Sequence, residues 1–352
     1  MSQAEALLDR DLDVAPSSSV RKTDKPQAAS LPLPQSPLYS RQLAEPDPSV
    51  HVQPLSAHTG AEISGVDLRQ ALKPGQVASI VQALHRWKVV FFRDQHLSHD
   101  QHVEFARQFG ELTVGHPVFG HVEGHPEIYS VGKHRKSDRE KGQSERRPWT
   151  GWHTDVTAAV NPPTASILRG VEIPPYGGDT LWTNLAVAYN TLSEPLKGFI
   201  ETLWAEHRFA PPEGNSATAL FNDKVNKASL VSHHPLVRVH PVTGEKLLFV
   251  SPSFVKSIVG VTPRESRVLL ELLFEHVTRQ EFTVRFKWQP DSIAFWDNRS
   301  TAHLAPNDIF DLDFDRQLYR VTLVGEVPQN VRGESSRIVS GDPVLAFHPT
   351  AY

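Results

Sequence analysis

From residue 165 onward, the chain carries many short apolar runs, each closed by a turn signal such as Gly177-Gly178 or Pro290-Asp291. Short runs rich in β-branched and aromatic residues favour strands, and a series of them with few long helices is typical of a jelly roll or a related barrel. The expected strands are 165–168, 180–183, 236–239, 247–250, 282–288, 293–296 and 318–324. The sequence therefore predicts a mainly β fold with flanking helices.

Three helices are expected beside these strands. The first covers residues 77–87, where apolar residues recur at helical spacing, and it leads into a fully apolar run at 89–92 that reads as a buried strand. Ser98 and Gln101 form a capping box at the start of the second helix. Thr262 begins the third, with proline at its first position and glutamate two residues later.

Residues 1–50 differ in composition from the rest of the chain, being rich in serine, proline, glutamine and alanine. Repeated prolines between residues 32 and 48 prevent a regular helix or strand ladder. We therefore predict a flexible N-terminal arm over residues 1–50, followed by one folded domain over residues 51–352. A packed extension that wraps the domain, or a lid in an oligomer, is the alternative.

The composition excludes several classes of site. The chain has no cysteine, which excludes disulfides, thiolate zinc sites, iron–sulfur clusters and cysteine nucleophiles, so any metal must be held by carboxylates and the 18 histidines. The net charge of −4 argues against a nucleic-acid partner. No apolar run is long enough to span a membrane, and no secretory signal pattern is present, so we expect a cytoplasmic protein. Nucleotide-loop and serine-elbow motifs are absent.

One pattern indicates a metal site. If the segment around His153 is extended, His153 and Asp155 point to one side and can bind one ion. His303, distant in sequence, would complete a set of two histidines and one carboxylate, which leaves three positions of Fe(II) for a bidentate cosubstrate and O2. This spacing also arises by chance, and a surface histidine beside a helix-capping aspartate is the alternative.

A pair of basic residues strengthens the case for a site. Arg316 and Arg320 share one face of an expected strand with Leu318 between them. Two like charges on an interior face are costly unless each meets an anion, and guanidinium groups suit carboxylates and sulfonates. The alternative is that Arg316 pairs with an aspartate at 311, 313 or 315 on an exposed loop.

Six ordered segments carry a family resemblance: 88–93, 115–118, 152–157, 177–182, 234–241 and 296–299. They resemble the taurine dioxygenase and alkylsulfatase family of Fe(II)/2-oxoglutarate-dependent dioxygenases over about residues 52–343, and segments 166–170 and 337–343 together with Trp204 are closest to alkylsulfatase-type members. The resemblance implies a double-stranded β-helix, a jelly roll, that spans residues 51–352. It also implies Fe(II) as the metal, with 2-oxoglutarate and O2 as cosubstrates.

The resemblance assigns roles residue by residue. The implied site residues are His153, Asp155 and His303 for the metal; Thr180 and Arg316 for the distal carboxylate of 2-oxoglutarate; and His116, Arg320 and the backbone N–H of Val156 for the anionic head of the substrate. Phe119 and Trp149 stand where taurine dioxygenase holds the substrate amine with Tyr and Asn. Because a buried ammonium without a partner costs several kcal/mol, taurine is disfavoured. An alkyl sulfate or sulfonate is expected instead, unless Phe119 simply packs in the core.

The implied reaction hydroxylates the carbon next to the anionic head, after which the product collapses to an aldehyde and sulfate or sulfite. The same chemistry on a carboxylate-bearing or biosynthetic substrate, by hydroxylation or desaturation, is one alternative, since guanidinium binds carboxylates equally well. A metal-binding jelly roll without oxidative activity is another. We expect a small anionic substrate, no nucleic acid, no membrane, and a homo-oligomer, either a dimer or a tetramer. The charged loop 135–148 is a candidate lid.

Overall fold

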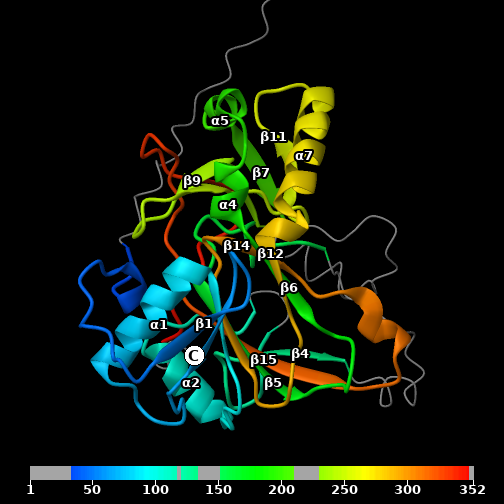
Figure 1. Ribbon diagram of the computed structural model, residues 1–352. Helices are drawn as coiled ribbons and strands as arrows, with labels where there is room; N and C mark the ends of the chain where they lie inside the picture. Colours follow the sequence, from blue (N-terminus) through cyan, green and yellow to red (C-terminus); the bar gives the residue numbers. More distant parts are fainter. Residues whose placement is uncertain (1–32, 117–119, 134–150, 210–229, 349–352) are drawn as a thin grey trace, which may run out of the picture.

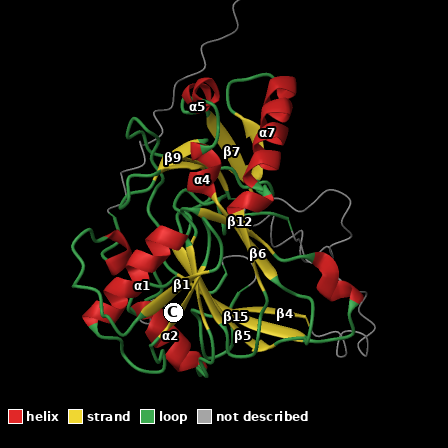
Figure 2. Cartoon of the chain, in the orientation of Figure 1, coloured by secondary structure: helices red, strands yellow, loops and turns green. Residues whose placement is uncertain are grey.

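The computed structural model describes residues 33–116, 120–133, 151–209 and 230–348. Its strands form two facing groups, with α1 and α2 against the lower group and α4, α5 and α7 at the upper end (Figures 1 and 2). The prediction of a mainly β jelly roll with flanking helices is confirmed.

The larger sheet has seven strands in the order β1-β2-β3-β13-β5-β15-β4. Their bounds are β1 His51–Pro54, β2 Ala61–Ser64, β3 Val89–Phe92, β4 Tyr129–Lys133, β5 Ala165–Glu172, β13 Ile293–Asp297 and β15 Arg316–Thr322. All pairs are antiparallel except β2 with β3. The apolar run predicted as a buried strand is β3, in which every residue is buried.

The facing group consists of smaller sheets in the orders β12-β6-β14, β11-β7-β8-β16 and β10-β9. Their bounds are β6 Thr180–Asn184, β7 Trp204–Arg208, β8 Val231–Pro235, β9 Val237–Val239, β10 Lys246–Leu248, β11 Val255–Ile258, β12 Thr283–Phe286, β14 Thr301–Leu304 and β16 Arg337–Ser340. All seven strands predicted from residue 165 onward overlap an observed strand. The pair β6 and β14 brings residue 303 opposite residue 182.

The two helices with a predicted cap, α2 and α7, begin directly after Ser98 and Thr262, whereas the helix predicted over 77–87 begins three residues earlier, at Pro74. Their bounds are α1 Pro74–Trp87, α2 His99–Arg107, α4 Leu185–Asn190, α5 Glu194–Ile200 and α7 Pro263–Val277, with 3-10 turns η1 Pro37–Tyr39, η2 Gln280–Phe282 and η3 Asn307–Asp311. At α2, the Ser98 hydroxyl accepts a hydrogen bond from the Gln101 N–H, and the Gln101 side chain accepts one from the Ser98 N–H. Thr262 caps α7 in the same manner.

Three clusters of buried apolar side chains hold these layers together. One lies between the large sheet and helices α1 and α2, and another lies between the smaller sheets and helices α4 and α7. The third joins β3, β5, β13 and β15 to β6 and β12, and it includes Trp182, Trp288 and Trp296. This third cluster fills the space between the facing sheets, so it forms the floor of anything that binds there.

The described part of the predicted flexible arm packs on the domain. Leu38 is fully buried in the cluster under α1 and α2, and the Tyr39 hydroxyl contacts Thr164 and Glu326. The prediction of a flexible arm is therefore wrong for residues 33–50, and the packed extension describes them. Leu43 and Val50 pack against the same cluster, and the Asp47 N–H donates a hydrogen bond of 3.0 Å to the Ser79 hydroxyl. Residues 1–32 lie outside the described part.

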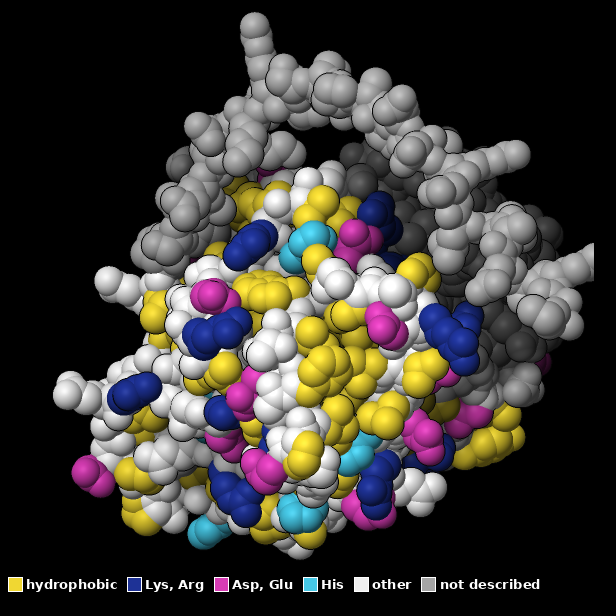
Figure 3. Space-filling view, turned by 90° about the horizontal axis from the view of Figure 1, so that it is seen from above, with side chains coloured by type: hydrophobic (Ala, Val, Ile, Leu, Met, Phe, Trp, Pro, Cys, Tyr) yellow, Lys and Arg dark blue, Asp and Glu magenta, His cyan; other side chains and the backbone are white. Residues whose placement is uncertain are grey.

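The upper end of the molecule exposes apolar side chains. Phe199 on α5 and Val268 and Leu272 on α7 are each about half exposed. Figure 3 looks onto this end and shows hydrophobic side chains interspersed with basic and acidic ones. Among the described residues, no helix has the length and apolar character needed to cross a bilayer.

Candidate metal centre and cosubstrate site

The three predicted metal ligands converge between the two sheets. His153 and His303 lie opposite each other in a short backbone bridge, in which the His153 N–H donates to the His303 carbonyl at 2.9 Å and the reverse bond is 2.6 Å. Oδ1 of Asp155 is 4.0 Å from Nε2 of His153 and 3.9 Å from Nε2 of His303. Donors that share one first-row metal ion lie about 3 to 4 Å apart, so the group fits one ion.

The protonation state of this group suits metal binding. Nδ1 of His153 lies 2.8 Å from the carbonyl oxygen of Gly151, which can only accept, so Nδ1 carries the proton and Nε2 is free to ligate. Burial lowers the pKa of His153 and lowers that of His303 to about 3. Burial alone would raise the pKa of Asp155, but Arg320 and the two imidazoles hold it well below its usual range. Two neutral imidazoles and one carboxylate result.

The backbone after the ligands is more sharply bent than predicted. His153 is paired with β14, but a turn begins at Asp155, so the segment is not extended throughout. Val156 has a φ of 49°, in the left-handed region that β-branched residues rarely adopt. The Asp155 carboxylate nevertheless lies beside both imidazoles, because the turn places it next to His303 on β14.

A second group, His85, His240 and Asp297, also has ligand atoms close together. Nδ1 of His240 accepts the backbone N–H groups of residues 242 and 243, and its Nε2 lies 3.1 Å from Asp297. Both carboxylate oxygens of Asp297 accept from Arg299, at 2.8 and 2.7 Å. These ligand atoms are already satisfied by the protein, so this group is a structural ion-pair network.

Arg316 occupies the position expected for binding a second anion. Its side chain is 5 % exposed, and its Nε has no hydrogen-bond partner among the described residues. Burial lowers its pKa to about 10, with Asp179 and Asp308 acting in the opposite direction. A Cβ on Gly178 would lie only 3.0 Å from Cδ of Arg316, so the glycine gives the side chain room. A buried guanidinium with a free donor fits a carboxylate.

Thr180 lies on β6, and its hydroxyl oxygen accepts a hydrogen bond of 2.9 Å from the indole N–H of Trp288. A hydroxyl that accepts from an indole has its own proton available for another acceptor. Thr180 and Trp288 are both 3 % exposed. This arrangement suits a hydroxyl that donates to a bound carboxylate.

Rings surround the remaining side of the metal group. Phe254 lies 6.1 Å from the ring of His153 and stacks on Phe209 at 5.8 Å. His116 follows, 6.4 Å from Phe209 and 5.0 Å from Tyr129, and Tyr129 lies 5.3 Å from the guanidinium of Arg320. The rings therefore form an arc from His153 to Arg320. Phe119, Trp149 and the loop 135–148 lie outside the described residues.

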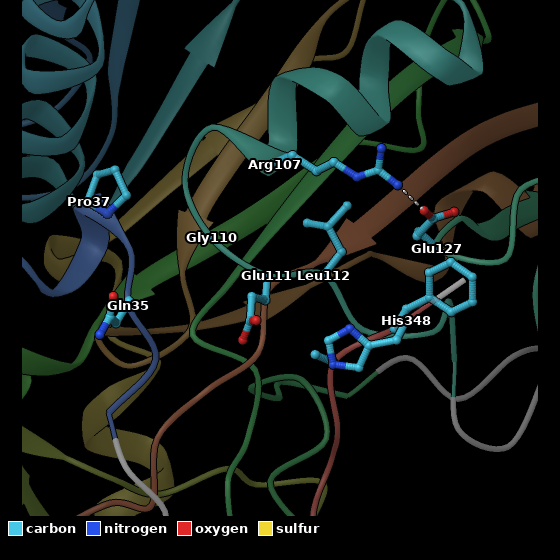
Figure 4. A pocket seen from close by; sticks show the side chains of 10 residues that line it. Gln35, Pro37, Arg107, Gly110, Glu111, Leu112, Glu127 and His348 are labelled. Atoms are coloured by element: carbon cyan, nitrogen blue, oxygen red, sulfur yellow. Dashed lines mark hydrogen bonds and ion pairs between the residues drawn. The ribbon is translucent and has the colours of Figure 1, made fainter. Parts of the chain in front are cut away.

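A pocket of about 340 Å³ lies away from this group, between the N-terminal segment, the end of α2 and the C-terminal tail (Figure 4). Its buried acid, Glu127, already pairs with Arg107 at 2.7 Å. None of the predicted site residues lines it. The pocket is therefore not the candidate reaction site.

Some residues around the site were not predicted. Trp288, Ser166 and Tyr129 contact the predicted residues directly or through a ring. Trp288 is adjacent to the turn at Pro290, and Ser166 lies in a segment that carries the family resemblance, but neither position alone indicates a partner. These contacts follow from strand pairing, since β4 pairs with β15 and places Tyr129 opposite Arg320, and β12, which precedes Trp288, pairs with β6.

Comparison with known proteins agrees with the geometry. The family model of the taurine catabolism dioxygenase TauD, TfdA family, matches residues 51–322. An alpha-ketoglutarate-dependent sulfate ester dioxygenase of Pseudomonas putida is 40 % identical over 294 residues, covering 81 % of this chain and 93 % of the relative. An alkylsulfatase of Acinetobacter baylyi is 38 % identical over 299 residues, covering 83 % and 90 %.

Two solved structures show the same likeness. A structure titled as a taurine dioxygenase from Burkholderia xenovorans is 64 % identical with a TM-score of 0.73, covering 84 % of this chain and 97 % of that one. The protein AAD-2, solved with Mn(II) and N-oxalylglycine, is 27 % identical with a TM-score of 0.63, covering 79 % and 98 %. The chain described here belongs to the TauD, TfdA family of dioxygenases.

Proposed function

We propose that this protein is an Fe(II)- and 2-oxoglutarate-dependent dioxygenase that hydroxylates the carbon next to the anionic head of an alkyl sulfate or sulfonate. One oxygen atom of O2 enters the new hydroxyl group and the other enters succinate, with release of CO2. The hydroxylated product then breaks its C–O or C–S bond and yields an aldehyde plus sulfate or sulfite. The convergence of His153, Asp155 and His303 beside Arg320 carries this proposal.

The cofactors follow from the family and from the donor set. Two imidazoles and one carboxylate suit Fe(II) and leave positions for a chelating cosubstrate and O2. Bound iron with 2-oxoglutarate and O2 supplies the oxidising chemistry. Related proteins carry alpha-ketoglutarate in their names, and AAD-2 was solved with Mn(II). The protein itself provides the ligands and orients the reactants.

Arg316 and Thr180 are proposed to bind the distal carboxylate of 2-oxoglutarate. Within the described part of the chain, Nε of the buried Arg316 guanidinium has no partner, and the Thr180 hydroxyl still has its proton to donate. Together they offer donors to both carboxylate oxygens. The cosubstrate would then reach the metal with its keto-acid end, because its other end is held between the sheets.

Arg320, His116 and the N–H of Val156 are proposed to receive the anionic head of the substrate. The strained backbone at Val156 supports this role, because left-handed β-branched residues persist where function requires them. Burial and the charge of Arg320 lower the pKa of His116 to about 3, so His116 is a neutral donor or acceptor. Phe209 and Phe254 give the apolar part of a substrate a surface next to the metal ligands.

An anaerobic absorption spectrum tests the cofactor proposal. Fe(II) and 2-oxoglutarate together are expected to give a weak visible charge-transfer band that neither gives alone, since the band requires bidentate chelation. Addition of a substrate should shift that band. A protein that only holds zinc in a jelly roll would show no band and no O2 consumption with iron, ascorbate and 2-oxoglutarate.

A substrate screen tests the identity of the head group. Alkyl sulfates and sulfonates are expected to give sulfate or sulfite, whereas a carboxylate substrate would give neither. Carboxylates are included because a 2,4-dichlorophenoxyacetate dioxygenase of Cupriavidus pinatubonensis is 30 % identical. Taurine is included because the Burkholderia structure is titled as a taurine dioxygenase, while the prediction from positions 119 and 149 disfavours it. Turnover of carboxylates alone would contradict the proposal.

Assembly and location stay predictions. We propose a homo-oligomer, and the half-exposed apolar side chains of α5 and α7 are a candidate contact surface. A cytoplasmic location is proposed from the sequence. Sedimentation of the purified chain tests the first, and cell fractionation tests the second.

A further inference from the structure

The two oxygens of Asp155 have different surroundings. Oδ1 faces Nε2 of both histidines and accepts a hydrogen bond of 2.6 Å from Arg320. Oδ2 instead accepts a hydrogen bond of 2.7 Å from the hydroxyl of Ser166. Oδ1 is therefore the oxygen that lies beside both histidines, and Oδ2 is the oxygen that Ser166 holds.

Ser166 is the last member of a hydrogen-bonded chain. The indole N–H of Trp296 donates to Oδ1 of Asn298 at 2.8 Å, and Nδ2 of Asn298 donates to Oγ of Ser166 at 2.9 Å. All three residues are at most 1 % exposed. The chain connects two neighbouring strands, since Trp296 on β13 lies opposite Ser166 on β5.

Only one direction of donation is possible along this chain. An indole N–H can only donate, so the Asn298 oxygen must face Trp296 and its amide nitrogen must face Ser166. The Ser166 oxygen accepts from that nitrogen, so its single proton is directed to Asp155. An ionised carboxylate can only accept, which completes the pattern without an alternative.

We propose that Trp296, Asn298 and Ser166 are positioning residues that hold Asp155 as a ligand through one oxygen only. This inference rests on the proposed function, because it assumes that Asp155 binds the metal. Oδ1 is the ligand atom because it lies next to Nε2 of both histidines, and the serine proton holds Oδ2 in a separate hydrogen bond. The metal then keeps three positions for 2-oxoglutarate and O2, rather than losing one to the second carboxylate oxygen.

Mn(II) binding, followed by the EPR signal of the free ion, tests this inference without any turnover. Ser166→Ala is expected to raise the dissociation constant about 10- to 100-fold, the usual cost of losing a partner of a metal ligand. Asn298→Ala should act through the same serine. As a single substitution it should raise the dissociation constant, but added to Ser166→Ala it should change that constant less than about twofold.

Ser266→Ala is the matched control. Ser266 is a buried serine on α7 that accepts one hydrogen bond of 2.9 Å from the Ile258 N–H, so its loss removes one buried hydroxyl away from the metal group. It should leave Mn(II) affinity unchanged. Thermal unfolding of each variant shows that the protein tested is folded.

The outcomes separate the two proposals. Wild-type protein that binds no Mn(II), or His153→Ala protein that binds it normally, overturns the proposed function and this inference with it. Wild-type binding that is lost in His153→Ala but unchanged in Ser166→Ala overturns the inference alone. Additive effects of the Ser166 and Asn298 substitutions would also overturn it, because independent structural damage adds whereas a chain does not.

Discussion

Arg320 donates to the same oxygen of Asp155, Oδ1, that faces the two histidines, at 2.6 Å. The guanidinium therefore lies within one hydrogen bond of the metal group, while Arg316 lies four residues away on the same face of β15, with Leu318 between them. One strand thus carries both guanidinium groups that are proposed to bind the two anions of the reaction.

The two arginines are expected to give different kinetic effects. Arg316→Ala should raise KM for 2-oxoglutarate, because it removes the buried partner of the distal carboxylate. At saturating iron, Arg320→Ala should mainly raise KM for the substrate; saturating iron is needed because Arg320 also donates to Asp155. Removal of a charged hydrogen bond costs about 1.5 to 3 kcal/mol, or roughly 10- to 150-fold. Steady-state kinetics with each reactant varied in turn measures both, and an interchange of the two effects would refute the assignment.

The metal ligands give the largest expected loss. His153→Ala or His303→Ala should abolish iron-dependent turnover of 2-oxoglutarate, since either removes one of three ligands. His102→Ala is a useful comparison, because it also deletes a buried imidazole, but one outside the metal group. Succinate formation measures the effect. Normal succinate production by a folded His303→Ala protein would rule out the proposed triad.

Trp288→Phe should raise KM for 2-oxoglutarate about three- to tenfold with little effect on substrate KM. The indole N–H orients the Thr180 hydroxyl, and a neutral hydrogen bond contributes about 0.5 to 1.5 kcal/mol. Thr180→Val, which removes the hydroxyl itself, should have at least as large an effect. An unchanged KM in Trp288→Phe, with Thr180→Val impaired, would show that the indole does not orient the threonine.

Phe254→Ala should weaken the dependence of KM on the length of the alkyl tail. Each buried methylene contributes about 0.8 kcal/mol, so KM should fall roughly fourfold per carbon as long as the tail contacts rings. Without the Phe254 ring, fewer tail carbons contact an apolar surface, so KM should fall less per added carbon. A homologous series of alkyl sulfates measures the slope for wild type and variant. An equal slope in both would place the tail elsewhere.

Acid should destabilise the fold below pH 6.5. Burial lowers the pKa of His102 and His234 to about 3 and that of His240 to about 4. In the unfolded chain these groups take up protons as the pH falls through 6.5, but in the folded protein they stay neutral until about pH 4 or 3. Protons therefore favour unfolding in that window, by about 1.4 kcal/mol per pH unit for each histidine.

Urea unfolding between pH 8 and pH 5 measures this loss. His102→Leu should reduce the dependence of the unfolding free energy on pH by about 1.4 kcal/mol per pH unit, the contribution of one histidine. Stability that stays constant from pH 7 to pH 5 in the wild-type protein would contradict the expectation.

The sequence predicted that His153, Asp155 and His303 come together, because the first two lie two residues apart and the third follows the recognisable segment 296–299. Strand alternation alone predicted that the side chains of Arg316 and Arg320 lie on one face of the same strand. The chain from Trp296 to Ser166 was beyond its reach, because these residues are 130 positions apart and meet only through the register of β13 and β5. Strand β14, only four residues long, was likewise not separable from its surroundings.

The failure at residues 33–50 has a related cause. Proline content correctly indicated that no long element forms, but it carries no information on whether a cavity elsewhere accepts Leu38. Burial of one such side chain contributes about 1.5 to 3 kcal/mol, and the contacts of Tyr39 add to it. Tertiary fit thus overrode local composition.

The packing of Leu38 and Tyr39 connects the N-terminal segment to the residues that support the metal group. The Leu38 carbonyl accepts from Arg299, and Arg299 clamps Asp297 at the start of the turn that leads to His303. A recombinant version trimmed past residue 39 would leave the Glu326 carboxylate without its phenol and Arg299 without a carbonyl. A truncated protein intended for crystallisation should therefore keep residue 33 and everything after it, so that the contacts of Leu38 and Tyr39 are retained.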